Sequence, residues 1–151
     1  RAEGSEKKQK EDGILTSQKA LLTWMIDDDR LFDQISQYIS PGDFTESLYR
    51  TVAELLYEQR KQGALNPAKI LNHFTEEDHR EAASLFNTRI KELRTKEERE
   101  QALQETILRV KSYSIEHQTM NLDPTDMRGL QHLMEEKRKL ENLKNLNITI
   151  Q

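Results

Sequence analysis

The sequence predicts an all-α fold: a multi-helix bundle followed by a long connecting helix and a C-terminal helical hairpin. Apolar residues recur three and four positions apart over most of the chain, which is the period of an amphipathic helix. Capping residues, prolines or glycines stand where these periodic segments begin and end. The alternation typical of a strand is confined to residues 147–150 and is too short to matter.

Three regions are expected along the chain. Residues 1–13 are charged and lack apolar periodicity, which predicts a flexible linker without regular structure. Residues 14–112 are expected to form the helical bundle, and residues 113–151 the hairpin. Because the sequence starts at Arg1 and not at Met, we expect it to be a fragment of a longer protein.

The first two helices are predicted on either side of an acidic run. The first spans about Ser17 to Asp27, with Ser17 as a possible cap, and Asp27 to Asp29 offer caps for the second. Pro41 and Gly42 should end the second helix. The residues expected to face the core are Ile14, Leu21, Leu22, Met25 and Ile26 from the first segment, and Leu31, Phe32, Ile35 and Ile39 from the second.

Three shorter helices are predicted next. One ends at Gly63, where a helix C-terminal glycine belongs, and Asn66 with Pro67 starts another. Thr75 and Asp78 form a weak capping box for a segment that breaks near Asn87. The inward positions are Leu48, Val52, Leu55, Leu56 and Gln59, then Ile70, Leu71 and Phe74, then Ala82, Phe86, Ile90 and Leu93.

The longest helix should follow the capping box of Thr95 and Glu98 and run for about 25 residues. Asp123 and Pro124 then predict the start of the last helix, which folds back as a hairpin. The stripe of the long helix, Leu103, Ile107, Val110, Ser114 and His117, weakens toward its end. The last helix carries Met127, Leu130, Leu133, Met134, Leu140 and Leu143.

Composition excludes several classes of function. The 23 basic and 27 acidic residues leave a net charge of −4, so no broad attraction for nucleic acid or an anionic membrane is expected. The absence of cysteine excludes a disulfide scaffold and a thiolate metal site. No apolar run approaches the roughly 18–20 residues that a membrane span needs. A cytoplasmic protein is expected.

No catalytic motif, metal site or cofactor site is predicted. Glu76 and His79 have the spacing used in helical di-iron bundles, but such a bundle needs a second pair, which the sequence lacks. Glycine-rich phosphate loops and nucleophile elbows are also absent. The chain is therefore interpreted as a non-enzymatic module.

Direct nucleic-acid binding has weak support. The basic run Lys137 to Lys139 follows Glu135 and Glu136, and Arg89, Lys91, Arg94 and Lys96 precede two further glutamates, so the local field is small. Aromatic residues at core spacing favour packing over base stacking. These are Trp24, Tyr38, Tyr49, Tyr57 and Tyr113.

The segment from Lys19 to Gly63 resembles the opening helices of the C-terminal helicase-interaction domain of bacterial DNA primase. The N-terminal domain of the hexameric replicative helicase shares these helices. The cues are the pairs Leu21–Leu22, Leu31–Phe32 and Asp43–Phe44, and the resemblance extends from about Ile14 to the C-terminus.

The resemblance implies a module of bacterial DNA replication that joins primase to the replicative helicase in the primosome and modulates both activities. The parent chain would be a DNA-directed RNA polymerase whose active site lies outside this fragment. The expected partner is the N-terminal domain of the helicase, with no direct nucleic-acid contact and a monomer when alone. The alternatives are the helicase's own self-associating N-terminal domain and a small helical nucleic-acid binder.

Within this family the terminal hairpin is the principal helicase-binding element. Because apolar residues continue past what two helices should cover, we expect the binding residues at the end of the chain. The alternative is that these aliphatic residues only cap the hairpin's own core. Deleting Asn142 to Gln151 is expected to abolish binding and leave the bundle's melting intact. The candidate partner-binding residues are Arg138, Lys139, Asn142, Leu143, Leu146, Ile148 and Ile150.

Overall fold

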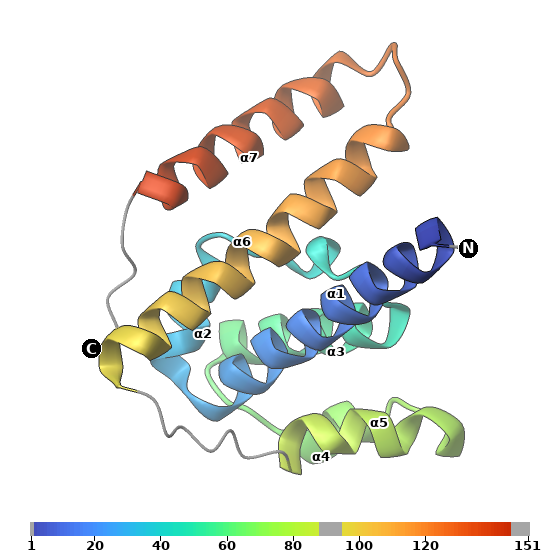
Figure 1. Cartoon of the computed structure of the whole chain (residues 1–151). Coiled ribbons are helices and arrows are strands. Elements are labelled where there is room, and N and C mark those ends of the chain that lie inside the picture. The colour runs from blue at the N-terminus through green and yellow to red at the C-terminus, as the bar shows by residue number, and fades with distance from the viewer. Residues whose placement is uncertain (1, 88–94, 146–151) are drawn as a thin grey trace.

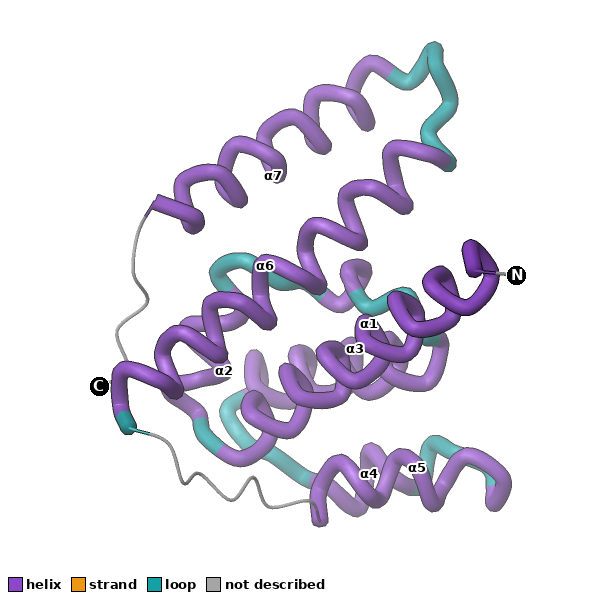
Figure 2. The backbone as a smooth tube through the Cα atoms, in the orientation of Figure 1, coloured by secondary structure: helices purple, strands orange, loops and turns teal. Residues whose placement is uncertain are grey.

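A computed structural model describes residues 2–87 and 95–145, and these residues form seven α-helices and one 3₁₀ turn, with no strand among them (Figures 1 and 2). The all-α fold predicted from the sequence is confirmed. The elements are α1 (Ala2–Asp27), α2 (Asp29–Ser36), η1 (Pro41–Asp43), α3 (Ser47–Gln62), α4 (Pro67–Leu71), α5 (Glu76–Asn87), α6 (Lys96–Met120) and α7 (Met127–Asn145).

The first helix begins much earlier than predicted. Helix α1 starts at Ala2, so the expectation of no regular structure before Ile14 is wrong, although residues 4–13 are all exposed. Glu, Lys and Gln are good helix formers, and the half of α1 docked on the core supplies the nucleus from which a helix can propagate. Ser17 is not a cap: its hydroxyl donates to the carbonyl oxygen of Gly13 inside the helix.

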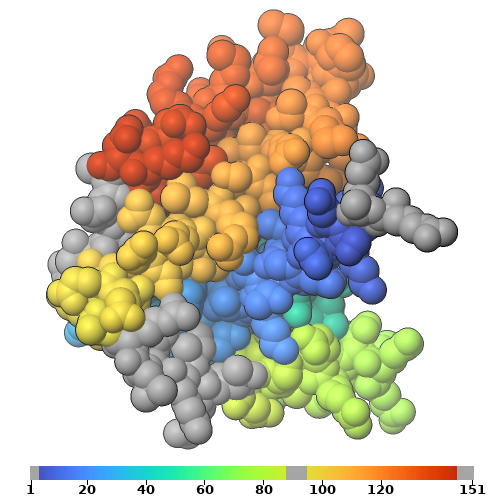
Figure 3. All heavy atoms as spheres, viewed as in Figure 1, coloured from blue at the N-terminus to red at the C-terminus, as the bar shows by residue number. Residues whose placement is uncertain are grey.

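The core lies where α1 packs against α2, α3, α5 and α6. Figure 3 shows α6, in yellow to orange, directly against α1 in blue. Most of the predicted inward positions in the described ranges are buried. His117 is exposed, and the half-buried ones are Ile26, Leu31, Leu48, Leu55, Leu71, Phe74 and Phe86. The fully buried large side chains are Leu21, Leu22, Met25, Ile35, Ile39, Phe44, Leu56, Ile70, Leu85, Leu103, Ile107 and Leu143.

Local capping sets several helix ends. The Asp28 carboxylate accepts from the backbone N–H of Arg30 to start α2, and the Asn66 side chain accepts from Lys69 to start α4. Gly63 ends α3 with a φ of 90°, a conformation that favours glycine. The described part of α5 reaches Asn87, and the residues after the predicted break, Ile90 and Leu93 among them, lie outside the described residues.

Helices α6 and α7 form the predicted antiparallel hairpin (Figure 1). Helix α6 has 25 residues, and the Thr95 hydroxyl accepts from the backbone N–H of Glu98 and donates to its carboxylate. Burial along α6 continues to Ile115, so the predicted boundary at residue 112 falls within a helix that serves both the bundle and the hairpin.

The last helix starts three residues later than predicted. Asp123 accepts hydrogen bonds from the backbone N–H and hydroxyl of Thr125, so its carboxylate holds a turn. The helix is capped instead by Asp126, whose carboxylate accepts from the backbone N–H of Gly129. None of the helices in residues 2–87 and 95–145 is both long and apolar enough to cross a membrane.

Candidate protein-binding hairpin

Exposed large apolar side chains gather on the hairpin. Within the described ranges, the four that stand out are Met120, Met127, Leu130 and Met134, with 80%, 68%, 40% and 56% of their surface exposed. Met120 ends α6 and Met127 begins α7. Apolar side chains grouped on one surface, in a chain that is 33% charged, are typical of an interaction site. We call these four residues the methionine face.

Helical spacing aligns the methionine face along α7. Leu130 and Met134 follow Met127 by three and seven positions, so the three side chains lie on one side of the helix. Arg138 comes four residues after Met134 and extends the same side. The buried leucines Leu133, Leu140 and Leu143 lie on a neighbouring side that packs toward α6.

A groove of about 530 Å³ runs between α6 and α7 beside the methionine face. Ile115, Leu133 and Leu140 supply its buried apolar surface, and Met120, Leu130 and Met134 supply its exposed apolar edges. The charged residues that line it are Glu116, Lys137, Glu141 and Lys144. An apolar groove with a charged rim between two helices suits an amphipathic helix of a partner.

The turn between the two helices is built from short polar contacts. The side chain of Asn121 donates to the carbonyl oxygen of His117 at the end of α6. Hydrogen bonds from the backbone and hydroxyl of Thr125 lower the pKa of Asp123, so this carboxylate stays ionised in the turn. The turn therefore presents Met120 and Met127 at the tip of a defined hairpin.

The structure divides the predicted partner-binding residues into three groups. Arg138, Lys139 and Asn142 are exposed on α7. Leu143 is buried, with 1% of its surface exposed, and belongs to the main core cluster, so the expectation that the hairpin leaves it uncovered is wrong. Its backbone carbonyl also accepts from Nε2 of Gln104 on α6. Leu146, Ile148 and Ile150 lie outside the described residues.

Sequence reasoning missed the exposed apolar surface near the tip of the hairpin. Met127, Leu130 and Met134 were grouped with the buried leucines because all six positions are apolar. The sequence does contain a signal that separates two apolar sides of α7. Met127 and Met134 repeat on one side of the helix, and Leu133 and Leu140 repeat on the other. Met120 carried no comparable signal because it is the last residue of its helix.

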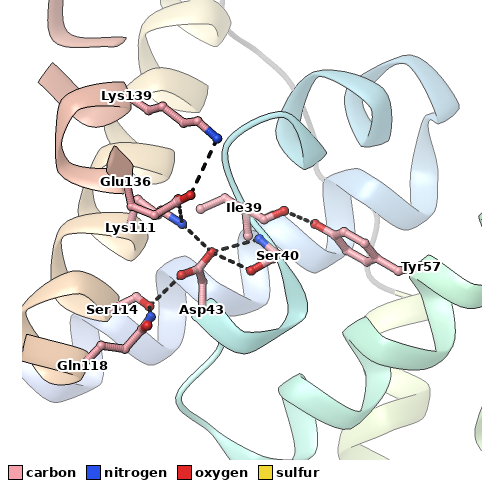
Figure 4. Close-up of polar contacts among 9 residues, drawn as sticks. All are labelled: Ile39, Ser40, Asp43, Tyr57, Lys111, Ser114, Gln118, Glu136 and Lys139. Atoms are coloured by element: carbon pink, nitrogen blue, oxygen red, sulfur yellow. Dashed lines mark hydrogen bonds and ion pairs between the residues drawn. The ribbon is translucent and has the colours of Figure 1, made fainter. Parts of the chain in front are cut away.

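A buried polar network lies where the hairpin meets the bundle (Figure 4). Nζ of Lys111 lies 2.9 Å from Oδ2 of Asp43 and 2.5 Å from Oε2 of Glu136. Asp43 also accepts from the hydroxyl of Ser114 at 2.7 Å and from the backbone N–H of Ser40 at 2.8 Å. No local sequence pattern indicates this network, since its members come from η1 with its N-cap residue Ser40, from α6 and from α7.

The network does not resemble an acid–base site. Burial raises the pKa of Glu136, but the hydrogen bond and charge of Lys111, together with the charges of Lys139 and His132, outweigh burial and lower it. General acid–base catalysis near neutral pH needs a group whose pKa lies near neutrality. Glu136 is shifted in the opposite direction, which favours a structural role.

The other candidate sites singled out from the sequence are dispersed. Glu76 and His79 are both exposed in the first turn of α5, and the described residues contain no group of three potential metal ligands. Trp24, Tyr38, Tyr49 and Tyr57 pack in or against the core cluster. Their packing role is confirmed. Comparisons with protein-family models, curated proteins and solved structures found no match for this chain.

Proposed function

We propose that this chain is the helicase-interaction module of a bacterial DNA primase, and that its hairpin binds the N-terminal domain of the hexameric replicative helicase. The proposal joins the resemblance of residues 19–63 to one structural observation. That observation is the methionine face and its groove, on a hairpin that projects from the helical bundle. Recruitment of primase to the replication fork would follow from this contact.

The methionine face has the properties of a binding surface that adapts to a helix. Methionine side chains are unbranched and polarizable, so they conform to irregular apolar partners. The exposed basic residues Arg138 and Lys139 lie farther along α7, outside the apolar centre. Charges at the rim of an interface chiefly affect the association rate. We therefore assign most of the binding energy to the methionine face, and the electrostatic steering of the partner to Arg138 and Lys139.

A binding assay with two matched variants tests the proposal. The double variant Met127→Glu/Met134→Glu places two charges on the α7 part of the methionine face. The control Ala68→Glu adds a charge at an exposed position in the first turn of α4, on the opposite side of the bundle from α7 (Figure 1). We expect the original chain and the control to form a stable complex with a bacterial replicative helicase in size-exclusion chromatography. The double variant should bind at least about tenfold more weakly.

Two results would contradict the proposal in different ways. If the original chain forms no complex with several bacterial replicative helicases, the primase assignment fails and only the fold remains. If the double variant binds as tightly as the original chain, the helicase is the partner but the bundle is its docking surface.

A further inference from the structure

Lys111 is a buried cation held between carboxylates from two different elements. Its side chain is 7% exposed, and the side chains of Asp43 in η1 and Glu136 in α7 are 2% and 15% exposed. Figure 4 shows the ammonium group between the two carboxylates, with Asp43 on the bundle side and Glu136 on the α7 side. One lysine therefore connects the last helix to the bundle.

The two carboxylates are not equivalent. Asp43 is also held by Ser114 of α6 and by the backbone and hydroxyl of Ser40, so its contacts are complete without α7. Glu136 has Lys111 as its partner in α6 and Lys139, 3.6 Å away, as a partner within its own helix.

This asymmetry changes the consequence of separating α7 from the bundle. Removing one partner of a buried ion pair normally leaves an uncompensated charge in the interior, which is strongly unfavourable. Here Lys111 would keep Asp43, and Glu136 would keep Lys139. The polar network therefore allows α7 to leave without stranding a buried charge on either side.

The remaining attachments of α7 among the described residues lie along one side of the helix and face α6. Leu133, Leu140 and Leu143 are its buried side chains, and Gln104 donates to the carbonyl oxygen of Leu143. Helix α7 packs chiefly against α6, whereas α1 packs against four other elements of the bundle. Segments with few buried apolar contacts open at lower free energy than the core.

We propose that α7 is a detachable arm, fastened by the Lys111–Glu136 pair, that opens as a unit while α1–α6 stay folded. The inference does not depend on the identity of the partner. Opening of the arm would uncover the apolar side of α6 around Ile115 and the buried side of α7, which the closed hairpin covers.

Amide hydrogen exchange of the full chain, resolved by residue, tests this inference. The variant Glu136→Gln removes the charge that fastens α7, and Glu135→Gln is the matched control, because Glu135 is the exposed neighbour on the same helix. In Glu136→Gln we expect the hydrogen-bonded amides of α7 to exchange roughly tenfold faster. This increase corresponds to the free energy that one charge-assisted hydrogen bond contributes to keeping α7 closed. The amides of α1 and α3 should keep their rates, and Glu135→Gln should match the original chain.

Three outcomes would overturn the inference. If α7 amides exchange no faster in Glu136→Gln, the ion pair does not fasten the helix. If the amides of all helices accelerate by the same factor, α7 opens only when the whole domain unfolds. If Glu135→Gln accelerates α7 as much as Glu136→Gln, the effect reflects the charge of the helix and not the contact with Lys111.

Discussion

Phe44 is the largest of the fully buried side chains, and it connects η1 to α3. Phe44→Ala should lower the free energy of unfolding by about 3–5 kcal/mol, since it removes an aromatic ring and leaves a cavity in a packed core. Urea unfolding followed by circular dichroism measures the loss. Phe74→Ala, at a half-buried position, should cost less, and a loss below about 1 kcal/mol for Phe44→Ala would mean that the junction can collapse around the cavity.

Gly129 stands inside the first turn of α7, where glycine is normally unfavourable. A Cβ atom there would lie 2.5 Å from Oδ2 of Asp126 and 2.7 Å from Cδ1 of Leu122. The same Asp126 carboxylate caps the helix through the backbone N–H of Gly129. Glycine at this position thus leaves room for the cap and for the leucine that closes the turn.

Gly129→Ala should therefore lack the stabilisation that Gly→Ala usually brings in a helix. Gly13 provides the control, because it is also helical and a Cβ atom there would have no neighbour within 4 Å. Gly13→Ala should stabilise the protein by about 0.5–1 kcal/mol. The free energy of unfolding of Gly129→Ala should be about 1–2 kcal/mol lower than that of Gly13→Ala, because the capping side chain of Asp126 must move. Equal melting shifts for the two variants would show that the Asp126 and Leu122 side chains rearrange without loss.

The buried ion pairs of Lys111 could not be predicted from the sequence. Lys111 sits among the inward positions Ile107, Val110 and Ser114, where a lysine looks like an interruption of the stripe. Its partner Asp43 lies 68 residues away in the chain. No local pattern pairs them, because the contact exists only after η1, α6 and α7 have packed together.

At the scale of the element, helix ends were predictable where the cap is local. Asp28, Asn66 and Thr95 each accept a hydrogen bond from a residue two or three positions later, so the signal lies within a few residues of sequence. The start of α7 was misplaced because Asp123 and Asp126 are both suitable caps. In the structure the hydroxyl of Thr125 donates to the Asp123 carboxylate, and Asp126 is the residue that caps α7.

The faces of the hairpin helices were harder to predict than their ends. Periodicity identifies which residues share a side of a helix, but not which of two apolar sides packs inward. In α7 the leucine side packs on α6, where Leu133 and Leu140 line the groove together with Ile115, and the methionine side stays exposed. Sequence reasoning therefore missed the exposed methionine side of α7 and counted the buried Leu143 among the partner-binding residues.

The burial of Leu143 changes what a C-terminal truncation should do. Deleting residues 142–151 removes a core side chain and the carbonyl that Gln104 contacts, so the bundle's melting should not stay intact as first expected. We expect a loss of at least about 2 kcal/mol in the free energy of unfolding. Deleting only residues 146–151 keeps Leu143 and separates its contribution from that of the tail. Similar melting of the longer deletion and the full chain would show that α7 contributes little to the core.

For the whole molecule, the all-α class was predictable because the helical period persists from Ile14 to Leu143 and few residues contradict it. A fold of this kind does not specify a function, since helical bundles support many activities. The functional argument depends on where the molecule departs from a closed bundle. Those departures are the exposed methionine face and the polar junction at Lys111, and both require the assembled structure.

The expected solution state follows from the charge of the chain and from the apolar surface that the described residues expose. Copies of this chain carry the same net charge of −4, which disfavours self-association through the four side chains of the methionine face. We expect a monomer of 17.8 kDa at micromolar concentrations, measured by sedimentation equilibrium at several loadings. Dimers or trimers that Met127→Glu/Met134→Glu disrupts and Ala68→Glu preserves would contradict this expectation. Such a result would favour a self-associating domain of the helicase type, because the methionine face would then be buried between copies of the same chain.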